Sequence, residues 1–135
     1  MRRCVTRVVL DASALLAWLK KERGHGVVER YLDDAVISTV NLSETIAKSL
    51  VKGGSLEVVY AQIQSLNLGV LSFTEEECLI AATFHVTTKD LGISLGDRAC
   101  LALGCKLQLP VVTAEHRWKD FDSGVELIMI REWKN

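Results

Sequence analysis

Short apolar runs alternate with segments of helical periodicity along the whole chain, and this alternation restricts the possible fold more than any other feature. Residues 5–10, 35–38, 69–73, 111–113 and 126–130 are apolar and rich in β-branched side chains, a pattern typical of buried strands. Buried strands that are separated by helices form a parallel sheet with helices on both faces. The sequence therefore predicts an α/β fold in a single domain, residues 1–135.

Helical patterns fill the intervals between the predicted strands. They are residues 14–22, residues 27–32, a stretch that ends at Gly53, a stretch that begins after Ser55, residues 74–88 and residues 97–108. Thr74 and Glu77 have the spacing of a capping box, in which each side chain accepts a hydrogen bond from the other residue's backbone. In a sheet of this kind, ligands bind at the carboxyl ends of the strands.

The charge balance gives no global electrostatic reason to bind nucleic acid or membranes, because 16 basic and 17 acidic residues leave a net charge of −1. A polyanion would have to bind a local basic patch or a bound metal ion. No apolar stretch approaches the length of a bilayer-spanning helix, and residues 8–10 are too short an apolar run for a signal peptide. We therefore expect a soluble, cytoplasmic protein with no membrane partner.

Four cysteines occur in apolar surroundings: Cys4, Cys78, Cys100 and Cys105. A core of this size needs no cross-links, so we expect buried free thiols rather than disulfides. No two cysteines have the C-x-x-C spacing of a zinc ribbon.

Four acidic residues stand at predicted strand ends or helix starts: Asp11, Glu44, Asp97 and Glu115. Each has an ordinary structural explanation. Asp11 would cap the helix that follows it, and Glu115 would be a first-turn carboxylate favoured by the helix dipole. Glu44 and Asp97 would each complete a capping box with the polar residue three positions earlier.

The shared location of these acids favours a joint role. The carboxyl ends of parallel strands meet at one edge of the sheet, so the four side chains would lie close together. Carboxylates gathered in one place repel one another and take up protons unless a cation is present. Carboxylate-rich sites suit hard ions such as Mg²⁺ or Mn²⁺, which activate water and bind phosphodiesters. The sequence therefore predicts a metal site built from the four acids.

The segments around the four acids resemble the motifs of PIN-domain nucleases. In chain order they are residues 9–15 (VLDASAL), 41–44 (NLSE), 95–104 (LGDRACLALG) and 112–118 (VTAEHRW). Their order and spacing, together with the chain length, are similar to those of the compact VapC-like toxins of prokaryotic toxin–antitoxin pairs. The resemblance extends over essentially the whole chain.

This resemblance implies a five-stranded parallel sheet flanked by helices, and an endoribonuclease that hydrolyses RNA phosphodiester bonds. Asp11, Glu44 and Asp97 would be the main ligands of one or two Mg²⁺ or Mn²⁺ ions. Ser13 and Thr113 would orient carboxylates or water through their hydroxyl groups. The implied partners are an RNA substrate, an antitoxin protein and a second copy of the chain in a homodimer.

The fourth acid departs from the family pattern, which usually has aspartate where Glu115 stands. The extra methylene changes the reach of the carboxylate, so a second metal ion would be held through water, or Asp120 would replace Glu115 as the ligand. The alternative function is a non-catalytic PIN-fold module that binds RNA or protein after the loss of its metal site.

Basic residues next to the acids in sequence are candidates for RNA phosphate contacts, namely Arg98, Arg117 and Lys119. Trp118 is expected to pack against the sheet, and His116 is a lesser candidate for a general base.

Two helical segments carry more apolar surface than a monomer requires. Candidates for the homodimer interface or the antitoxin groove are residues 14–19 together with Leu56, Val59, Tyr60 and Ile63.

Overall fold

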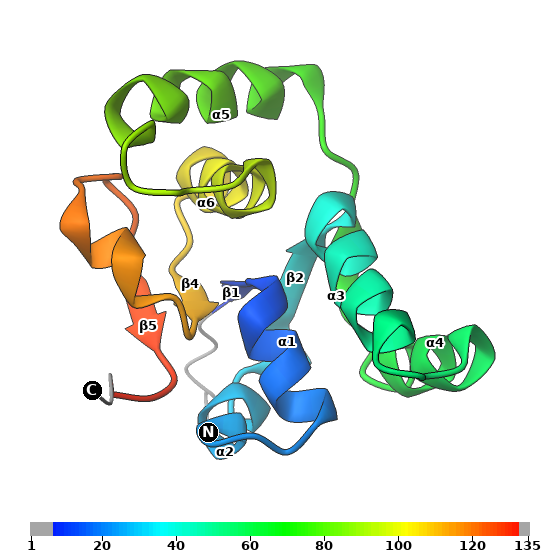
Figure 1. The fold of residues 1–135 in the computed structure, drawn as a ribbon. Coiled ribbons are helices and arrows are strands. Elements are labelled where there is room, and N and C mark those ends of the chain that lie inside the picture. The colour runs from blue at the N-terminus through cyan, green and yellow to red at the C-terminus, as the bar shows by residue number, and fades with distance from the viewer. Residues whose placement is uncertain (1–6, 133–135) are drawn as a thin grey trace, which may run out of the picture.

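A computed structural model describes residues 7–132 and shows five parallel strands in one sheet (Figure 1). The order across the sheet is β3-β2-β1-β4-β5. The strands are β1 (Val8–Leu10), β2 (Ala35–Ser38), β3 (Gly69–Leu71), β4 (Val111–Thr113) and β5 (Leu127–Met129). The predicted α/β fold is therefore confirmed, with the first, third and fifth strands shorter than expected. Residues 5 and 6 of the predicted first strand lie outside the described residues.

Six α-helices connect and cover these strands within residues 7–132. They are α1 (Ala12–Leu19), α2 (His25–Glu29), α3 (Thr39–Val51), α4 (Leu56–Gln64), α5 (Glu75–Thr88) and α6 (Leu95–Leu107), with short 3₁₀ helices at Leu32–Asp34 and His116–Asp120. None of these helices is long and apolar enough to cross a membrane.

Two hydrophobic cores lie on opposite faces of the sheet, because successive side chains of a strand point to opposite sides. Val8 and Leu10 pack with α1, α2 and α4 on one face. Val9, which lies between them, packs with α6 and with Phe84 of α5 on the other face. Figure 1 shows the same arrangement, with α5 and α6 on one side of the sheet and α1 and α2 on the other.

Several helices begin where local hydrogen bonding directs them rather than where apolar periodicity suggests. Helix α3 begins at Thr39, directly after β2, and the Ser38 hydroxyl caps it by accepting from the backbone N–H of Val40 at 3.2 Å. The interpretation of Asn41 as the cap of this helix, with Glu44 as its capping-box partner, is therefore wrong. The predicted capping boxes of α5 and α6 are both present.

The carboxyl ends of β1 and β4 lie at the point where the order of the strands reverses. From β1 the chain builds β2 and β3 on one side, and it then returns to add β4 and β5 on the other. Leu10 of β1 is paired with Val112 of β4, so the residues that follow them emerge side by side. Ligands bind at such switch points in open α/β sheets.

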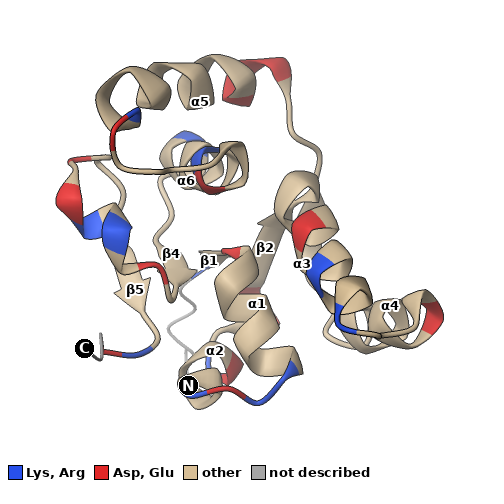
Figure 2. Ribbon diagram, in the orientation of Figure 1, with Lys and Arg blue, Asp and Glu red and all other residues tan. Residues whose placement is uncertain are grey.

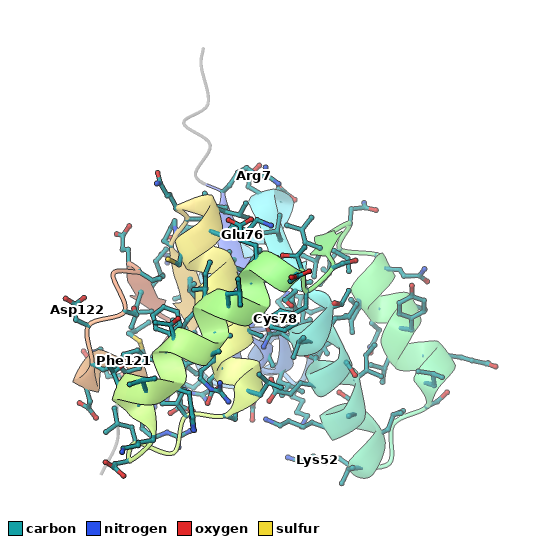
Figure 3. All side chains as sticks on the ribbon, turned by 90° about the horizontal axis from the view of Figure 1, so that it is seen from above. Arg7, Lys52, Glu76, Cys78, Phe121 and Asp122 are labelled. Carbon is teal, nitrogen blue, oxygen red and sulfur yellow. The ribbon has the colours of Figure 1, made fainter. Side chains whose placement is uncertain are left out.

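Some of the predicted burial is wrong. Cys100 is buried, but Cys78 and Cys105 are exposed, and all three are free thiols. Figure 3 shows Cys78 on α5, the outermost helix of its face. Each exposed cysteine follows an apolar pattern in sequence but faces away from the sheet, because the buried stripe of a helix covers only part of its circumference. Cys4 lies outside the described residues.

The predicted docking surface on α4 is divided between core and solvent. Val59 and Ile63 belong to the core, whereas Leu56 and Tyr60 are exposed. The first pair is therefore excluded from any interface by its burial in the fold.

Candidate active site

Asp11 is the centre of a hydrogen-bond network at the switch point of the sheet. Its side chain is buried, and its Oδ2 atom accepts from the Ser13 hydroxyl at 2.5 Å and from the Thr113 hydroxyl at 3.0 Å. No described residue donates to Oδ1. The Ser13 hydroxyl also accepts from the backbone N–H of Ala114 at 2.9 Å. These bonds connect the start of α1 to the end of β4 and fix the position of the Asp11 carboxylate.

Burial raises the pKa of Asp11 from its ordinary value of 3.8 to about 6. The hydrogen bond from Ser13 opposes this change, the negative charge of Asp97 reinforces it, the bond from Thr113 opposes it and the charge of Glu44 reinforces it. Burial also raises the pKa of the nearby Cys100 thiol, and the same three acids contribute to that increase. Asp11, Glu44 and Asp97 are therefore close enough to influence one another and a shared neighbour.

Glu44 lies in the second turn of α3, where that helix contacts α6. The Asn41 side-chain N–H donates to the backbone oxygen of Gly96 at 2.9 Å and joins the two helices. A Cβ atom on Gly96 would lie only 3.1 Å from both carboxylate oxygens of Glu44. The absence of a side chain at Gly96 thus allows the Glu44 carboxylate to approach the start of α6, a requirement that the sequence pattern alone did not reveal.

Asp97 closes the capping box of α6. Its Oδ2 atom accepts from the backbone N–H of Ser94 at 2.9 Å, and its own N–H donates to the Ser94 hydroxyl at 3.1 Å. The structural interpretation of Asp97 is therefore confirmed, but it does not replace the functional one. Capping uses a single oxygen of the carboxylate, and the charge of Asp97 still acts on Asp11. Figure 2 shows acidic segments of α3 and α6 on the side of the sheet where α1 begins.

Glu115 is bound to a basic neighbour. Arg117 donates to both of its carboxylate oxygens, from Nε at 2.8 Å and from Nη2 at 3.0 Å, and donates from Nη1 to the backbone oxygen of Gly92. The hydrogen bonds from Arg117 hold the pKa of Glu115 below its ordinary value. The charges of Asp97 and Glu44 raise the pKa of Asp11, whereas Glu115 reaches the same network through its backbone N–H, which donates to the Thr113 hydroxyl at 2.9 Å.

The other predicted contact residues differ in placement. Arg98 extends towards α5, where its Nη1 donates to the backbone oxygen of Ala81, and its Nε is buried. Arg98 is half-buried as a result, and its contact with RNA stays a prediction. Lys119 is exposed, and Trp118 is buried in the core as predicted. The imidazole Nε2 of His116 lies 2.9 Å from the backbone oxygen of Arg131.

A complete metal-binding cluster is not preformed in the part of the chain that the structure describes. Residues 7–132 contain no group of three or more His, Cys, Asp or Glu side chains arranged to hold an ion. The donor chemistry nevertheless fits a hard cation, since a buried carboxylate and two negative neighbours are mutually repulsive without one. The metal site therefore stays a prediction.

The comparison with known proteins identifies the family. A model of the PIN domain matches residues 8–124, so the chain belongs to the PIN-domain family, as its motifs predicted. PIN domains are in general nucleases that use divalent metals. A search of curated proteins found no match.

Solved structures with the same fold include a toxin–antitoxin complex. A complex from Klebsiella pneumoniae matches with a TM-score of 0.73 and 13% identity, covering 93% of this chain and 99% of the other. DNA-bound VapBC from Salmonella typhimurium gives 0.73 and 17%, with coverage of 93% and 99%. FitAcB from Neisseria gonorrhoeae gives 0.72 and 20%, with coverage of 91% and 97%. At these identities the likeness establishes the fold alone.

Proposed function

We propose that the chain is a divalent-metal-dependent endoribonuclease and the toxin of a toxin–antitoxin pair. The observation that carries the proposal is the environment of Asp11. A buried carboxylate at the switch point of the sheet accepts two hydroxyl hydrogen bonds and is repelled by Asp97 and Glu44. Such an arrangement is costly for stability and is characteristic of a site that binds a cation.

Asp11, Glu44 and Asp97 would hold Mg²⁺ or Mn²⁺. A bound ion of this type activates water and neutralises charge on a phosphodiester. Ser13 and Thr113 fix the Asp11 carboxylate through Oδ2, so that Oδ1 stays without a hydrogen-bond donor. The negative charge of the three acids disfavours a free anion at this position. The same charge favours a divalent cation, which can bind a phosphate in turn.

Glu115 would contribute indirectly. Its carboxylate holds the guanidinium of Arg117, and the charge of Asp97 also acts on that guanidinium. Arg117 is thus the basic residue best placed to meet an RNA phosphate beside the acids. A second metal ion would require Glu115 to exchange Arg117 for the ion, or Asp120 to act in its place.

The Glu115–Arg117 pair also supports the second candidate, a non-catalytic PIN-fold module that binds RNA or protein. A carboxylate already neutralised by arginine is a poor ligand for a second cation. The two candidates differ in whether the protein cleaves RNA when metal is supplied.

The proposed partners follow from the family and from the exposed surface. The structural neighbours are toxin–antitoxin complexes, and an antitoxin is therefore the protein partner that we propose. Exposed apolar side chains on α4 are available for a homodimer or for that antitoxin, namely Leu56, Val58 and Tyr60. We propose a cytoplasmic location, where an RNA substrate is present.

The decisive experiment measures cleavage of single-stranded RNA with Mg²⁺, with Mn²⁺ and with EDTA. Wild type is compared with Asp97→Asn and with Asp90→Asn, an exposed acid that serves as the matched control. We expect metal-dependent cleavage by wild type and the control, and a loss of at least about 100-fold in Asp97→Asn, the usual scale for a group that acts on the transition state. Cleavage that survives in Asp97→Asn, or that persists in EDTA, would refute the assigned site.

A further inference from the structure

A pocket between α1 and α3 lies directly beside the Asp11 network. It has a volume of about 410 Å³, within the range of small-ligand sites. Ser13, whose hydroxyl donates to Asp11, is one of its lining residues. The pocket therefore borders the place where the proposed chemistry occurs, with Ser13 between the two.

The lining of this pocket is part apolar, with Leu16 buried and Ala47 and Val51 exposed, and part basic. Leu16 of α1 and Ala47 and Val51 of α3 supply the apolar surface. Four basic side chains line the same pocket against one acid, Glu22, and they are Lys20, Lys48, Lys52 and Arg131. Figure 2 shows the basic segments at the end of α1 and along the C-terminal half of α3, and Figure 3 labels Lys52 at the end of α3.

Two of the basic side chains, Lys20 and Lys52, are held close to each other in spite of their like charge. The pKa of Lys20 is lowered, first by its side-chain contact with Lys52 and then by slight burial and by the charge of Lys52. Lys48 also lies 3.7 Å from the Glu44 carboxylate, so it connects the basic part of the lining to the acidic site. Arg131 is anchored by a hydrogen bond from its Nη1 to the backbone oxygen of Arg23 at 2.9 Å. An anion that entered the pocket would relieve this repulsion.

We propose that this pocket binds the nucleotide next to the scissile phosphate, with the lysines Lys20 and Lys52 on the RNA backbone and the base against Leu16 and Ala47. This inference rests on the proposed function and identifies how an acidic site tolerates a polyanion. The combination of apolar and cationic lining residues matches the two parts of a nucleotide, its base and its phosphate. An acidic protein segment would meet the same charges, but its binding would not require the pocket to lie next to Ser13 and Asp11.

The test compares two double variants that each remove two positive charges. Lys20→Ala/Lys52→Ala alters the pocket, whereas Arg30→Ala/Lys89→Ala alters exposed residues that do not line it. Both are made in the Asp97→Asn background, so that RNA stays intact. Fluorescence anisotropy then follows the binding of a short fluorescein-labelled single-stranded RNA in Mg²⁺ over a range of salt concentrations, and thermal melting checks that each variant is folded.

We expect the pocket variant to bind about tenfold more weakly at low salt. The slope of log K against log salt should fall by about 1.4, since each phosphate contact on a single strand contributes about 0.7. Ala47→Phe, at an exposed position in the pocket lining, should weaken binding without changing this slope, because the larger side chain occupies the pocket and the charge is unchanged. Equal binding by the two double variants would overturn the inference, and so would a pocket variant that binds RNA normally but loses an acidic helical peptide.

These outcomes separate the inference from the proposed function. RNA binding that depends on Lys20 and Lys52 in a protein without metal-dependent cleavage supports the pocket and refutes the nuclease. Metal-dependent cleavage by wild type with equal RNA binding in the two double variants supports the nuclease and refutes the pocket.

Discussion

Replacing Asp11 with asparagine should stabilise the metal-free protein at neutral pH, although the residue is central to the proposed site. The folded protein holds the Asp11 proton with a pKa of about 6, against an ordinary value of 3.8 that applies to the unfolded chain. Asparagine keeps the size of the side chain and an oxygen that accepts from Ser13 and Thr113. It removes the buried charge, which is the source of the instability.

The sign and size of the effect follow from proton linkage. Below about pH 4, Asp11 is protonated in both states and contributes no difference in stability. Between about pH 4 and pH 6 the unfolded chain loses its proton first, so the free energy of unfolding of wild type falls as pH rises. Above about pH 6 the buried charge of Asp11 lowers the free energy of unfolding by its full amount. The two pKa values correspond to a penalty of about 3 kcal/mol.

Urea unfolding in EDTA between pH 4 and pH 8 measures this difference. Asp11→Asn should match wild type at the acidic end and exceed it by up to about 3 kcal/mol at pH 7 to 8. Glu29→Gln, at an exposed position, is the control and should show no such dependence. A stability difference that is constant with pH, or an Asp11→Asn protein less stable than wild type at pH 7, would refute the reasoning.

Metal ions should reverse the order of stability, so that wild type becomes more stable than Asp11→Asn. A cation that replaces the proton on Asp11 binds the folded state alone, and at 1,000 times its Kd it adds about 4.1 kcal/mol to the stability of wild type, more than the penalty of about 3 kcal/mol. Asp11→Asn should gain much less. Because Asp11 must lose its proton to bind metal, the affinity of wild type should also increase as pH rises through about 6.

Two further substitutions test how the site is held. Gly96→Ala would place a Cβ atom 3.1 Å from both carboxylate oxygens of Glu44, whereas Gly26→Ala, also in a helix, meets no atom within 4 Å. We expect Gly96→Ala to lower RNA cleavage about tenfold, the usual scale for residues that support metal ligands, with little change in thermal unfolding. Equal cleavage by both variants would contradict this expectation. Thr113→Val removes a donor to Asp11 and an acceptor for the backbone N–H of Glu115. Urea unfolding at pH 7 should therefore show a loss of about 1–3 kcal/mol in the free energy of unfolding. A loss within experimental error would show that these bonds are not needed.

Much of the fold could be predicted from sequence because its signals are local. The strands Ala35–Ser38 and Val111–Thr113 were predicted residue for residue, since β-branched apolar runs leave few alternatives. The capping boxes of α5 and α6 were also predicted, because such a box depends on residues only three positions apart. The order of the four motifs identified the family, and the family model confirmed it.

Features that depend on packing between distant segments could not be predicted in the same way. The hydrogen bond from Arg117 Nη1 to the backbone oxygen of Gly92 joins segments 25 residues apart, and no periodicity encodes it. The burial of Asp11, and hence its raised pKa, arises only when β1 and β4 are adjacent. In sequence Asp11 was equally compatible with an ordinary helix cap.

The sequence by itself determined the alternation of strands and helices, the positions of the acids and the family, because each is written in residues near one another along the chain. The tertiary structure alone decided which acids interact and which side chains face solvent, since these depend on how α1, α3 and α6 pack over the carboxyl edge of the sheet. The basic pocket between α1 and α3 is also a feature that only the tertiary structure decides. Its lysines, at positions 20 and 52, are far apart in sequence and meet only in the folded chain.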